Sequence, residues 1–584
     1  MWKLLKYMKA YRKESVCAPL FKLLEASFEL LVPLVMARII DVGIRNQDTA
    51  YILRMCLLMV TLGAIGLICS VTAQYFSAKA AVGFSTKLRQ VLFAHVQALS
   101  FTEMDDIGTS TLITRMTSDI NQVQSGVNLF LRLFMRSPFI VFGAMIMAFT
   151  IDTKAAMIFV VVIPVLCVIV FGIMLISIPL YRRVQEKLDG IVRLTRENLL
   201  GVRVIRAFCR ESQEIRTFDE NNDALVKVQL LSGRVSALMN PLTYVVINTG
   251  LIALLYTGAL RVDIGAITQG SVVALVNYMS QILVELVKLA NLIITVTKAI
   301  ACGNRIQRIL EVPEGMEASD SVENAAETEE QLAVSFDHVA FCYRGAGDDA
   351  LTDLTFSAKA GETIGIIGGT GSGKTSLVSL IPRFYDVREG SVRVNGRDVR
   401  SYSPDELRKK IGIVMQKPVL FKGTIRSNLL WGNEGASDEE MKEAIRKAQA
   451  EDILNASGEG LDAPVEQEGR NFSGGQKQRL TIARALVRSP EILILDDSAS
   501  ALDFATDARL RGAIRELNNS MTVFIVSQRT SSIAHADKIL VLEDGKLVGM
   551  GTHEELLQSC QVYQETHYSQ FPKPDETGCR EVRA

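Results

Sequence analysis

The sequence predicts a membrane protein of two unlike parts: an all-α domain of six transmembrane helices, followed by an α/β domain outside the lipid. Residues 1–310 contain repeated long apolar stretches, whereas from residue 334 short β-branched runs such as TIGIIG and EILILD alternate with helical stretches. Hydrophobic residues make up 48% of the 584 residues and charged residues 22%, so the chain fits neither a wholly soluble nor a wholly lipid-buried protein.

Six stretches of the first domain are apolar and long enough to cross a membrane, which takes about 20 helical residues. The clearest, AAMIFVVVIPVLCVIVFGIMLISIP, carries no charge. The first is the least apolar, because it contains four charged residues: Lys22, Glu25, Glu29 and Arg38. Either its cytoplasmic end protrudes from the membrane or one of its carboxylates faces a cavity. The predicted spans lie near residues 17–42, 51–76, 131–152, 155–179, 240–261 and 268–296.

Basic residues orient these spans. The segment before Glu14 is rich in Lys and Arg, and so are the two long polar gaps that follow the second and fourth spans. Because basic loops stay on the cytoplasmic side, the N-terminus, both gaps and the second domain are expected in the cytoplasm. Both gaps have a helical pattern, so the helices are predicted to continue beyond the bilayer, with breaks around Gly108 and residues 208–222.

Charge and cysteine content exclude other classes. A net charge of -1 argues against a nucleic-acid-binding protein, which would carry a basic excess. The nine cysteines are scattered without a CxxC pair, which indicates neither a disulfide framework nor a zinc site. No removable signal peptide is expected. Residues 311–333 are acidic and predict a solvated linker, and residues 571–584 predict a disordered tail.

A glycine-rich segment in the second domain predicts a phosphate-binding loop. Residues 368–375 read GGTGSGKT, which matches GxxxxGK[ST] and stands between a strand-like and a helix-like run. Glycines let backbone N–H groups wrap a phosphate chain, and a helix N-terminus adds partial positive charge. Lys374 is expected to reach the terminal phosphates and Thr375 to bind Mg²⁺. The predicted phosphate-binding residues are Gly368, Gly369, Thr370, Gly371, Ser372, Gly373, Lys374, Thr375 and Ser376.

Two further segments fit a nucleotide site. The run EILILD ends in Asp496, and a buried strand ending in an acid is the second metal-facing element of P-loop NTPases, although such strand ends also occur in other α/β cores. The sequence NFSGGQKQR at 471–479 offers exposed backbone donors at a helix start. It predicts a second phosphate cradle, or else a glycine-containing helix cap.

Together these motifs resemble the ATP-binding cassette (ABC) family over residues 334–570. The family signature LSGGQ here reads Phe472-Ser473-Gly474-Gly475-Gln476. The other family motifs follow in order: Tyr343 as the aromatic that stacks on adenine, Gln416 in the Q-loop, VEQEG at 465–469 as the exporter X-loop, and Ser500-Ala501-Leu502-Asp503 as the D-loop. The resemblance implies a RecA-like core with a helical subdomain. It also implies that ATP is bound with Mg²⁺ held by Thr375, Gln416 and Asp496.

The first domain resembles the exporter type of this family, called type IV, as found in multidrug exporters. The segment GVRVIRAFCRE at 201–211 is similar to its second intracellular loop. The resemblance implies export, with coupling helices near 101–110 and 205–215. It also implies two half-transporters that share two ATP molecules, each bound by one chain's P-loop and the other chain's signature. On this chain the residues for the partner-side ATP are Ser473, Gly474, Gly475, Gln476 and Asp503.

Two positions depart from the family pattern. Where the family has a glutamate that polarises the attacking water, this chain has Asp497, and where it has a histidine, this chain has Gln528. A displacement near 1 Å in a catalytic group can cost roughly 10²-fold in rate, and glutamine does not titrate as imidazole does. The site on this P-loop is therefore predicted to bind ATP and hydrolyse it slowly. This resembles the degenerate-site subunit of bacterial heterodimeric exporters, so the predicted partner is a different half-transporter with Glu and His; the alternative is a homodimer with two slow sites.

The transported compound is the least defined expectation. In the sixth span, Asn277, Gln281 and Glu285 share one helix face. With Glu29 they predict a pocket for amphipathic or cationic compounds, and the alternative is a structural pair of Glu285 with Lys288. A subunit of an exporter of drugs, lipids or peptides in a bacterial cell membrane is the leading hypothesis. A lipid flippase and an ATP-gated regulatory subunit without transport are the others.

Overall fold

The computed structural model describes residues 2–315, 332–516 and 521–571. Most of the predicted linker at 311–333 and of the predicted tail at 571–584 lies outside these residues. The chain divides into two compact units. The first comprises Met1–Gln97 and Ser110–Val312, and the second comprises Ala98–Thr109 and Pro313–Ala584. The short segment 98–109 therefore belongs with the second unit, and it includes most of the range 101–110, where the family resemblance implied a coupling helix.

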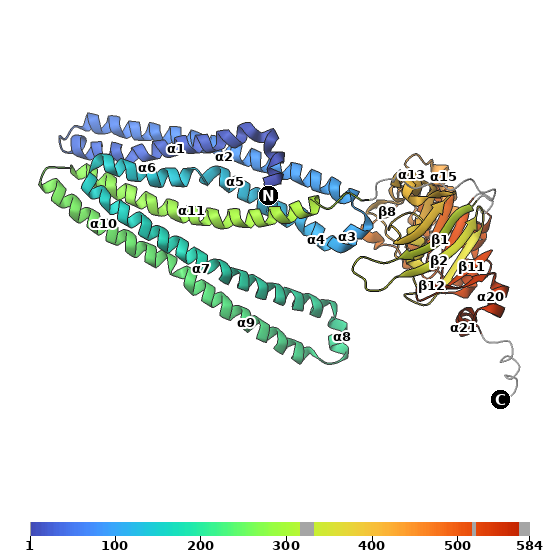
Figure 1. The fold of residues 1–584 in the computed structure, drawn as a ribbon. Coiled ribbons are helices and arrows are strands. Elements are labelled where there is room, and N and C mark those ends of the chain that lie inside the picture. The colour runs from blue at the N-terminus through green and yellow to red at the C-terminus, as the bar shows by residue number, and fades with distance from the viewer. Residues whose placement is uncertain (1, 316–331, 517–520, 572–584) are drawn as a thin grey trace. The chain divides into compact units, whose positions relative to one another are not determined.

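The first unit is a bundle of long helices that lie side by side (Figure 1). Its core is apolar and includes the fully buried Phe159, Leu254 and Tyr278. Close approach of α5 to α11 depends on Gly126, since a Cβ there would lie 2.2 Å from that of Ala299. The helices are α1 (Arg12–Arg38), α2 (Thr49–Ala98), α4 (Thr109–Thr114), α5 (Ile120–Leu133), α6 (Arg136–Ile151), α7 (Thr153–Leu200), α8 (Val202–Ala207), α9 (Glu211–Ala237), α10 (Met239–Asp263) and α11 (Gln269–Leu310), with shorter helical segments η1 (Trp2–Tyr11), η2 (Ile39–Ile44) and η3 (Arg115–Asp119).

Five helical stretches among the described residues are long and apolar enough to cross a membrane: Thr49–Ala98, Thr109–Ile151, Thr153–Leu200, Glu211–Asp263 and Gln269–Leu310. They contain the second to sixth predicted spans. The first predicted span falls in α1 and η2, which do not meet the same requirement, so the count of six rests on the sequence alone. The chain is a membrane-spanning protein with a helical domain ahead of an α/β domain.

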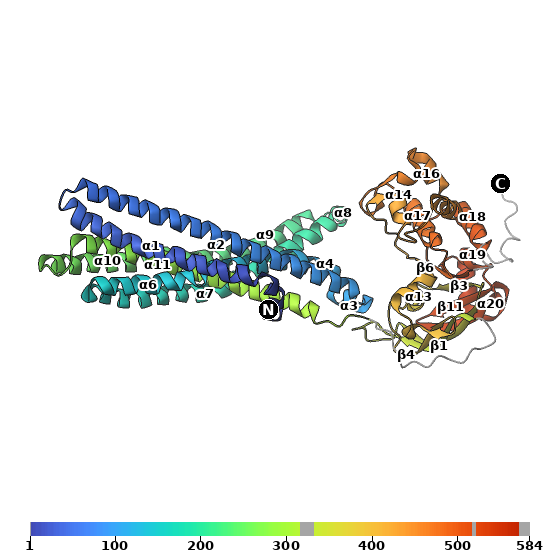
Figure 2. The ribbon, with the colours of Figure 1, turned by 90° about the horizontal axis from the view of Figure 1, so that it is seen from above.

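The helices extend far past the predicted spans, and the predicted breaks occur. Gly108, at a φ of 78°, follows α3 (Phe101–Ile107), a short helix whose N-terminus is capped by Ser100. The other break lies slightly earlier than predicted: α8 begins at Val202, and α7 and α9 run beside each other on either side of it (Figures 1 and 2). Exposed apolar side chains cluster around α8, where α7 ends and α9 begins. They include Leu200 and Phe208, which are 83% and 72% exposed.

Within the second unit, α3 is seated on the α/β domain by aromatic and polar contacts. The ring of Phe101 lies 4.5 Å from that of Phe384. The hydroxyl of Tyr385 donates to Asp105 Oδ2 at 2.8 Å, and burial together with this carboxylate raises the pKa of Tyr385. These contacts fix a short helix of the first long polar gap onto the domain that carries the phosphate-binding motif.

The α/β domain is built on two sheets. The smaller has the order β2-β1-β4-β5 and is antiparallel, and the larger has the order β12-β11-β3-β10-β9-β6 and is parallel except for β12. Together they enclose one apolar core. The strands are β1 (Leu332–Phe341), β2 (Leu351–Lys359), β3 (Thr363–Gly368), β4 (Glu389–Val394), β5 (Arg397–Asp398), β6 (Ile411–Val414), β9 (Ile492–Asp496), β10 (Thr522–Val526), β11 (Lys538–Glu543) and β12 (Lys546–Gly551).

Helices form a second group beside these sheets (Figure 2). The α14 to α17 segment, joined by the small β7–β8 pair, has its own apolar core around Ile445, Ile453 and Ile482. The elements are α12 (Lys374–Leu380), α13 (Pro404–Lys410), β7 (Gly423–Thr424), α14 (Ile425–Leu429), α15 (Asp438–Lys447), α16 (Glu451–Ser457), β8 (Pro464–Val465), α17 (Gly474–Val487), α18 (Phe504–Arg515), α19 (Thr530–Ile533), α20 (His553–Ser559) and α21 (Gln561–Gln570).

Candidate nucleotide site

The topology of the larger sheet brings the predicted nucleotide-binding residues to one edge. Strands β3, β10, β9 and β6 are parallel neighbours in that order, so their carboxyl ends meet. The phosphate-binding loop follows β3, Gln528 follows β10, Asp496 ends β9, and Gln416 follows β6. Residues far apart in the sequence therefore share one site because each lies just past a strand end.

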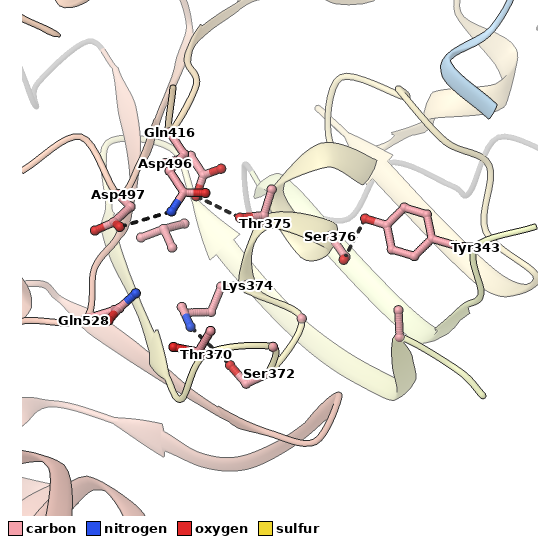
Figure 3. Close-up of a pocket in the computed structure, with 14 residues that line it drawn as sticks. Tyr343, Thr370, Ser372, Lys374, Thr375, Ser376, Gln416, Asp496, Asp497 and Gln528 are labelled. Atoms are coloured by element: carbon pink, nitrogen blue, oxygen red, sulfur yellow. Dashed lines mark hydrogen bonds between the residues drawn. The ribbon is translucent and has the colours of Figure 1, made fainter. Parts of the chain in front are cut away.

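These residues surround a cavity of about 340 Å³ (Figure 3). The cavity has the size of a small-ligand pocket. Twelve residues predicted from the sequence line it: Tyr343, Thr370, Gly371, Ser372, Gly373, Lys374, Thr375, Ser376, Gln416, Asp496, Asp497 and Gln528. Ala350 and Val526, which the sequence did not suggest, complete the lining.

Glycine is required at two points of the phosphate-binding loop. Gly373 has a φ of 93°, and a Cβ there would lie 2.7 Å from Ala350 O. At Gly368 a Cβ would lie 2.1 Å from Leu542 O. At these two positions the loop passes too close to neighbouring backbone for a side chain, so only glycine fits there.

Lys374 lies folded over this loop. Its Nζ donates to Gly368 O at 2.9 Å and to Gly369 O at 2.6 Å. Burial lowers the pKa of Lys374, while Asp497 and Asp496 act in the opposite direction. The two carboxylates thus offset only part of the cost of burying the ammonium. The negative charge of a triphosphate would further stabilise its charged form.

Thr375 and Asp496 present oxygen atoms to the same point. The Thr375 hydroxyl donates to Asp496 Oδ1 at 3.2 Å, and Asp496 is only 3% exposed. Burial raises the pKa of Asp496. A hydroxyl and a carboxylate that converge are the hard oxygen ligands that Mg²⁺ prefers, and the side-chain oxygen of Gln416 is available nearby. These three residues could hold the metal.

The Asp497 carboxylate lies at the far side of the cavity, where the amide of Gln416 donates to its Oδ2 at 3.4 Å (Figure 3). Its backbone is fixed in an uncommon conformation with a φ of 45°. The Asp497 N–H donates to Val526 O at 3.0 Å, and Ser500 donates to the Asp497 carbonyl. Hydrogen bonds on both sides of this residue hold its backbone in place, and its side chain is one methylene shorter than that of glutamate.

Tyr343 stands at the opposite end of the cavity. Its hydroxyl lies 2.9 Å from Ser376 Oγ at the start of α12, and the residue is 36% exposed (Figure 3). An exposed ring anchored beside the loop is available for stacking on a planar base.

The signature residues form a separate group that does not line this cavity. Ser473 caps α17 by accepting a hydrogen bond from Gln476 N–H at 3.3 Å, and Gln476 bonds back to the Ser473 backbone in a capping box. At Gly475 a Cβ would lie 2.9 Å from Ala501 O, so signature and D-loop are in contact. Asp503 caps α18. The starts of α17 and α18 are thus both capped. Gly474 is exposed, so backbone N–H groups at the start of α17 face away from this cavity and are accessible to a ligand.

Three of the four residues predicted to contact the transported compound already have partners in the described structure. Glu285 is 3% exposed, and its carboxylate is bound by Arg136 at 2.6 Å and Lys288 at 2.8 Å. Glu29 is bound by Arg136 at 2.7 Å. Asn277 donates to the backbone of its own helix. The Glu285–Lys288 pair thus forms, but as part of a wider ion network.

Arg136 is the centre of this network and was missed from the sequence. It links α6 to Glu285 on α11 and to Glu29 on α1, and Ser137 also donates to Glu285 at 2.8 Å. On α1, Lys22 and Glu25 form a further pair at 2.6 Å. A buried arginine needs such partners, so its position at the start of an apolar run was the available signal. In Gln281, Oε1 is buried and has no hydrogen-bond partner among the described residues.

Comparison with known proteins agrees with this architecture. The family model described as ABC transporter transmembrane region matches residues 16–286, and the model described as ABC transporter matches residues 351–500. An uncharacterized ABC transporter ATP-binding protein of Mycobacterium tuberculosis is 37% identical over 567 residues, 97% of each chain. An ATP-dependent lipid A-core flippase of Syntrophus aciditrophicus is 32% identical over 84% of this chain and 81% of its own.

A solved structure shows the same fold. The structure of a bacterial Atm1-family ABC exporter with ATP bound superposes with a TM-score of 0.79, covering 96% of this chain and 99% of that one. Its sequence is 24% identical to this chain, so the comparison supports the fold and no further property.

Proposed function

This chain belongs to the ABC transporters, as an exporter whose membrane and ATPase domains are fused, and on that premise we propose that it is the slow-site subunit of a heterodimer. In this proposal the chain's own P-loop binds ATP and hydrolyses it slowly. Its signature completes the hydrolytic site on a second, different half-transporter that carries Glu and His where this chain has Asp497 and Gln528.

The geometry around Asp497 is the observation that carries this proposal. The backbone of Asp497 is held by Val526 and Ser500, so the carboxylate cannot move toward a bound nucleotide by shifting its main chain. A carboxylate that stops about 1 Å short of the attacking water is expected to slow hydrolysis by roughly 10²-fold. Gln528 lines the same cavity and can donate a hydrogen bond, but it cannot take up a proton as histidine can.

This chain's own site has the side chains and backbone groups needed to bind ATP. Lys374 and the loop N–H groups would hold the phosphates, and Tyr343 would stack on the base. We include Mg²⁺ in the proposal, held by Thr375, Asp496 and Gln416; when bound it would neutralise phosphate charge. ATP would therefore be retained at this site while hydrolysis proceeds at the other.

The signature supports a role for this chain in a partner's site. Ser473 and Gly475 begin a well-capped helix, and Asp503 caps the next one, so hydrogen bonds within the chain hold both helix starts in place. The exposed apolar end of the α7–α8–α9 limb, with Leu200 and Phe208, is a further surface that a second chain would cover. ATP binding would close the two chains around both nucleotides, and hydrolysis on the partner's P-loop would reopen them.

For the transported compound we propose an amphipathic molecule, such as a lipid or hydrophobic drug, moved across a bacterial cell membrane. Relatives that include a lipid A-core flippase support this class. The ion network argues against Glu285 as a free attractor for cations, since Arg136 and Lys288 already neutralise it. Glu29, Gln281 and Asn277 remain candidates for polar contacts.

Purification with and without a partner tests the proposal. The full chain would be expressed alone and with a candidate half-transporter that carries Glu and His at the two positions, and Mg²⁺-ATPase rates measured in lipid nanodiscs. We expect the two chains to co-purify and the pair to be at least tenfold faster than this chain alone. Equal rates would favour a homodimer with two working sites. A fast pair that moves no lipid or drug would favour a regulatory subunit.

A further inference from the structure

A single amide of the C-terminal helix holds the backbone of the segment that carries Gln528. The Gln570 Nε2 donates to Gln528 O at 2.8 Å. On the other side of the same segment, Thr530 N–H donates to Gln570 Oε1 at 2.9 Å and the Thr530 hydroxyl donates to it at 3.2 Å. Both ends of one side-chain amide are therefore used to bridge residues 528 and 530.

The helix that presents Gln570 is itself firmly anchored. Tyr563, two turns earlier on α21, is fully buried, and its hydroxyl lies 2.7 Å from Nδ1 of His553. Next along the same helix, Nδ1 of His567 lies 3.2 Å from the Thr530 hydroxyl. Tyr563 packs in an apolar cluster with Ile367 of the strand that leads into the phosphate-binding loop. Gln570 is thus a polar group on a fixed support.

The opposite side of the held segment faces the nucleotide cavity. Gln528 lines that cavity together with Lys374 and Asp497 (Figure 3). Strand β10 ends at Val526, and Ser527 N–H makes the last bond to β3, with Ile366 O at 3.0 Å. Beyond that point the segment is held by Gln570 on one side and by the start of α19 (Thr530–Ile533) on the other, where Ser532 N–H donates to Arg529 O at 3.1 Å.

From this arrangement we propose that Gln570 is a positioning residue, which sets the place of the Gln528 amide at the phosphate end of the cavity. The C-terminal helix then determines how well this chain's site distinguishes a triphosphate from a diphosphate. The proposal goes beyond the slow-site function, because it concerns nucleotide discrimination and not turnover.

The expected effect is selective. Gln528 stands at the strand edge beside Lys374, where the terminal phosphate would lie, and Tyr343 and the base lie at the other end of the cavity. Releasing the Gln528 backbone should therefore weaken triphosphate binding and leave diphosphate binding nearly unchanged. A net contribution of one hydrogen bond corresponds to about a three- to tenfold change in affinity.

Two substitutions and a matched control test this on the full chain in nanodiscs. Gln570→Ala removes the bridge. Gln570→Glu keeps the acceptor for Thr530 but replaces the donor to the Gln528 carbonyl with an oxygen. The control is Gln564→Ala on the same helix, because Gln564 Nε2 donates at 2.8 Å to Leu557 O and has no contact with the held segment in the described structure.

The measurement is the ratio of dissociation constants for AMP-PNP and ADP, both with Mg²⁺, alongside the thermal unfolding midpoint without nucleotide. We expect Gln570→Ala and Gln570→Glu each to reduce the preference for AMP-PNP about three- to tenfold, while Gln564→Ala leaves it unchanged. If the Gln570 variants weaken both nucleotides equally, or change the ratio no more than Gln564→Ala does, the inference is overturned. If Gln570→Ala folds poorly, the affinity ratio of the isosteric Gln570→Glu decides whether the inference stands. Brisk turnover by the unmodified chain would end the slow-site proposal without affecting this ratio.

Discussion

Gln416 and Asp497 meet across the nucleotide cavity, with Nε2 of the glutamine 3.4 Å from Oδ2 of the aspartate. This contact joins the loop after β6 to the loop after β9, so the short carboxylate is directed toward the glutamine that would also face the metal. Burial raises the pKa of Asp497, and the Gln416 amide counteracts that rise. Several consequences of this arrangement are open to measurement.

Restoring the family residues should restore turnover. In the chain purified alone, Asp497→Glu with Gln528→His should raise the Mg²⁺-ATPase rate at least tenfold, because the carboxylate then reaches the attacking water and an imidazole faces the terminal phosphate. Either single change should give less than the pair. The same double variant carrying Lys374→Ala is the control and should be inactive. No gain from the double substitution would mean that another feature limits the rate.

The ring of Tyr343 should matter more than its hydroxyl. Tyr343→Phe removes the 2.9 Å contact with Ser376 but keeps the stacking surface, so ATP affinity should change less than threefold. Tyr343→Ala removes the surface and should weaken ATP about tenfold, in line with the energy of stacking on a base. Fluorescent-nucleotide titration of both variants measures this. Equal losses would assign the effect to the hydroxyl.

Glu285 and Glu29, the two carboxylates that lie within 3 Å of Arg136, should differ in importance. Glu285→Gln should destabilise the membrane domain by about 3 kcal/mol, since it removes a charge from a buried pair and leaves Arg136 and Lys288 less compensated. Glu29 has a side chain that is 40% exposed, so Glu29→Gln should cost under about 1 kcal/mol. Thermal unfolding in one detergent compares the two. A larger effect at Glu29 would contradict the burial argument.

Acidification should destabilise the α/β domain through His553. Burial first, and then His567 and His535, lower the pKa of His553 against the opposing effect of Glu554. The unfolded chain therefore binds the proton first, and stability is lost as the pH falls below about 6.5. His553→Asn should reduce this loss in thermal unfolding between pH 7.5 and 5.5.

His338 provides the contrast for that experiment. It is exposed, and Asp353 at 2.6 Å raises the pKa of its ring, so its contribution is present at low pH and is lost as the pH rises through the folded value. His338→Asn should therefore steepen the acid loss or leave it unchanged. If His553→Asn and His338→Asn shift the profile in the same direction, the assignment to His553 is wrong.

Motifs that act through the backbone explain why residues predicted from the sequence lie around one cavity. Gly368, Gly373 and Lys374 stand at fixed places on one loop, and Asp496 ends a strand, so local pattern and sheet topology together determine where they meet. The break around Gly108 lies where it was predicted, whereas the second break lies between α7 and α9 and most of the predicted range 208–222 is helical. The X-loop segment 465–469 begins at Val465, the last residue of the short strand β8, which pairs with β7.

The features that were not predicted depend on contacts between residues far apart in the sequence. Glu285 seemed available for a substrate because its partner Arg136 is 149 positions away and on another helix. The bridge from Gln570 to Gln528 spans 42 positions and follows no motif. Likewise, α3 packs on the α/β domain through the rings of Phe101 and Phe384, and no sequence motif indicates that these two residues meet.

The most direct test of the slow-site assignment compares two inactivations in the purified heterodimer. One variant replaces the catalytic glutamate of the partner with glutamine, and the other is Asp497→Asn on this chain, with Mg²⁺-ATPase rates measured in the same nanodiscs. We predict that the first abolishes turnover, at least a hundredfold, whereas the second leaves at least half of the rate. If Asp497→Asn abolishes turnover as well, this chain's site hydrolyses ATP in every cycle and the proposed asymmetry does not exist.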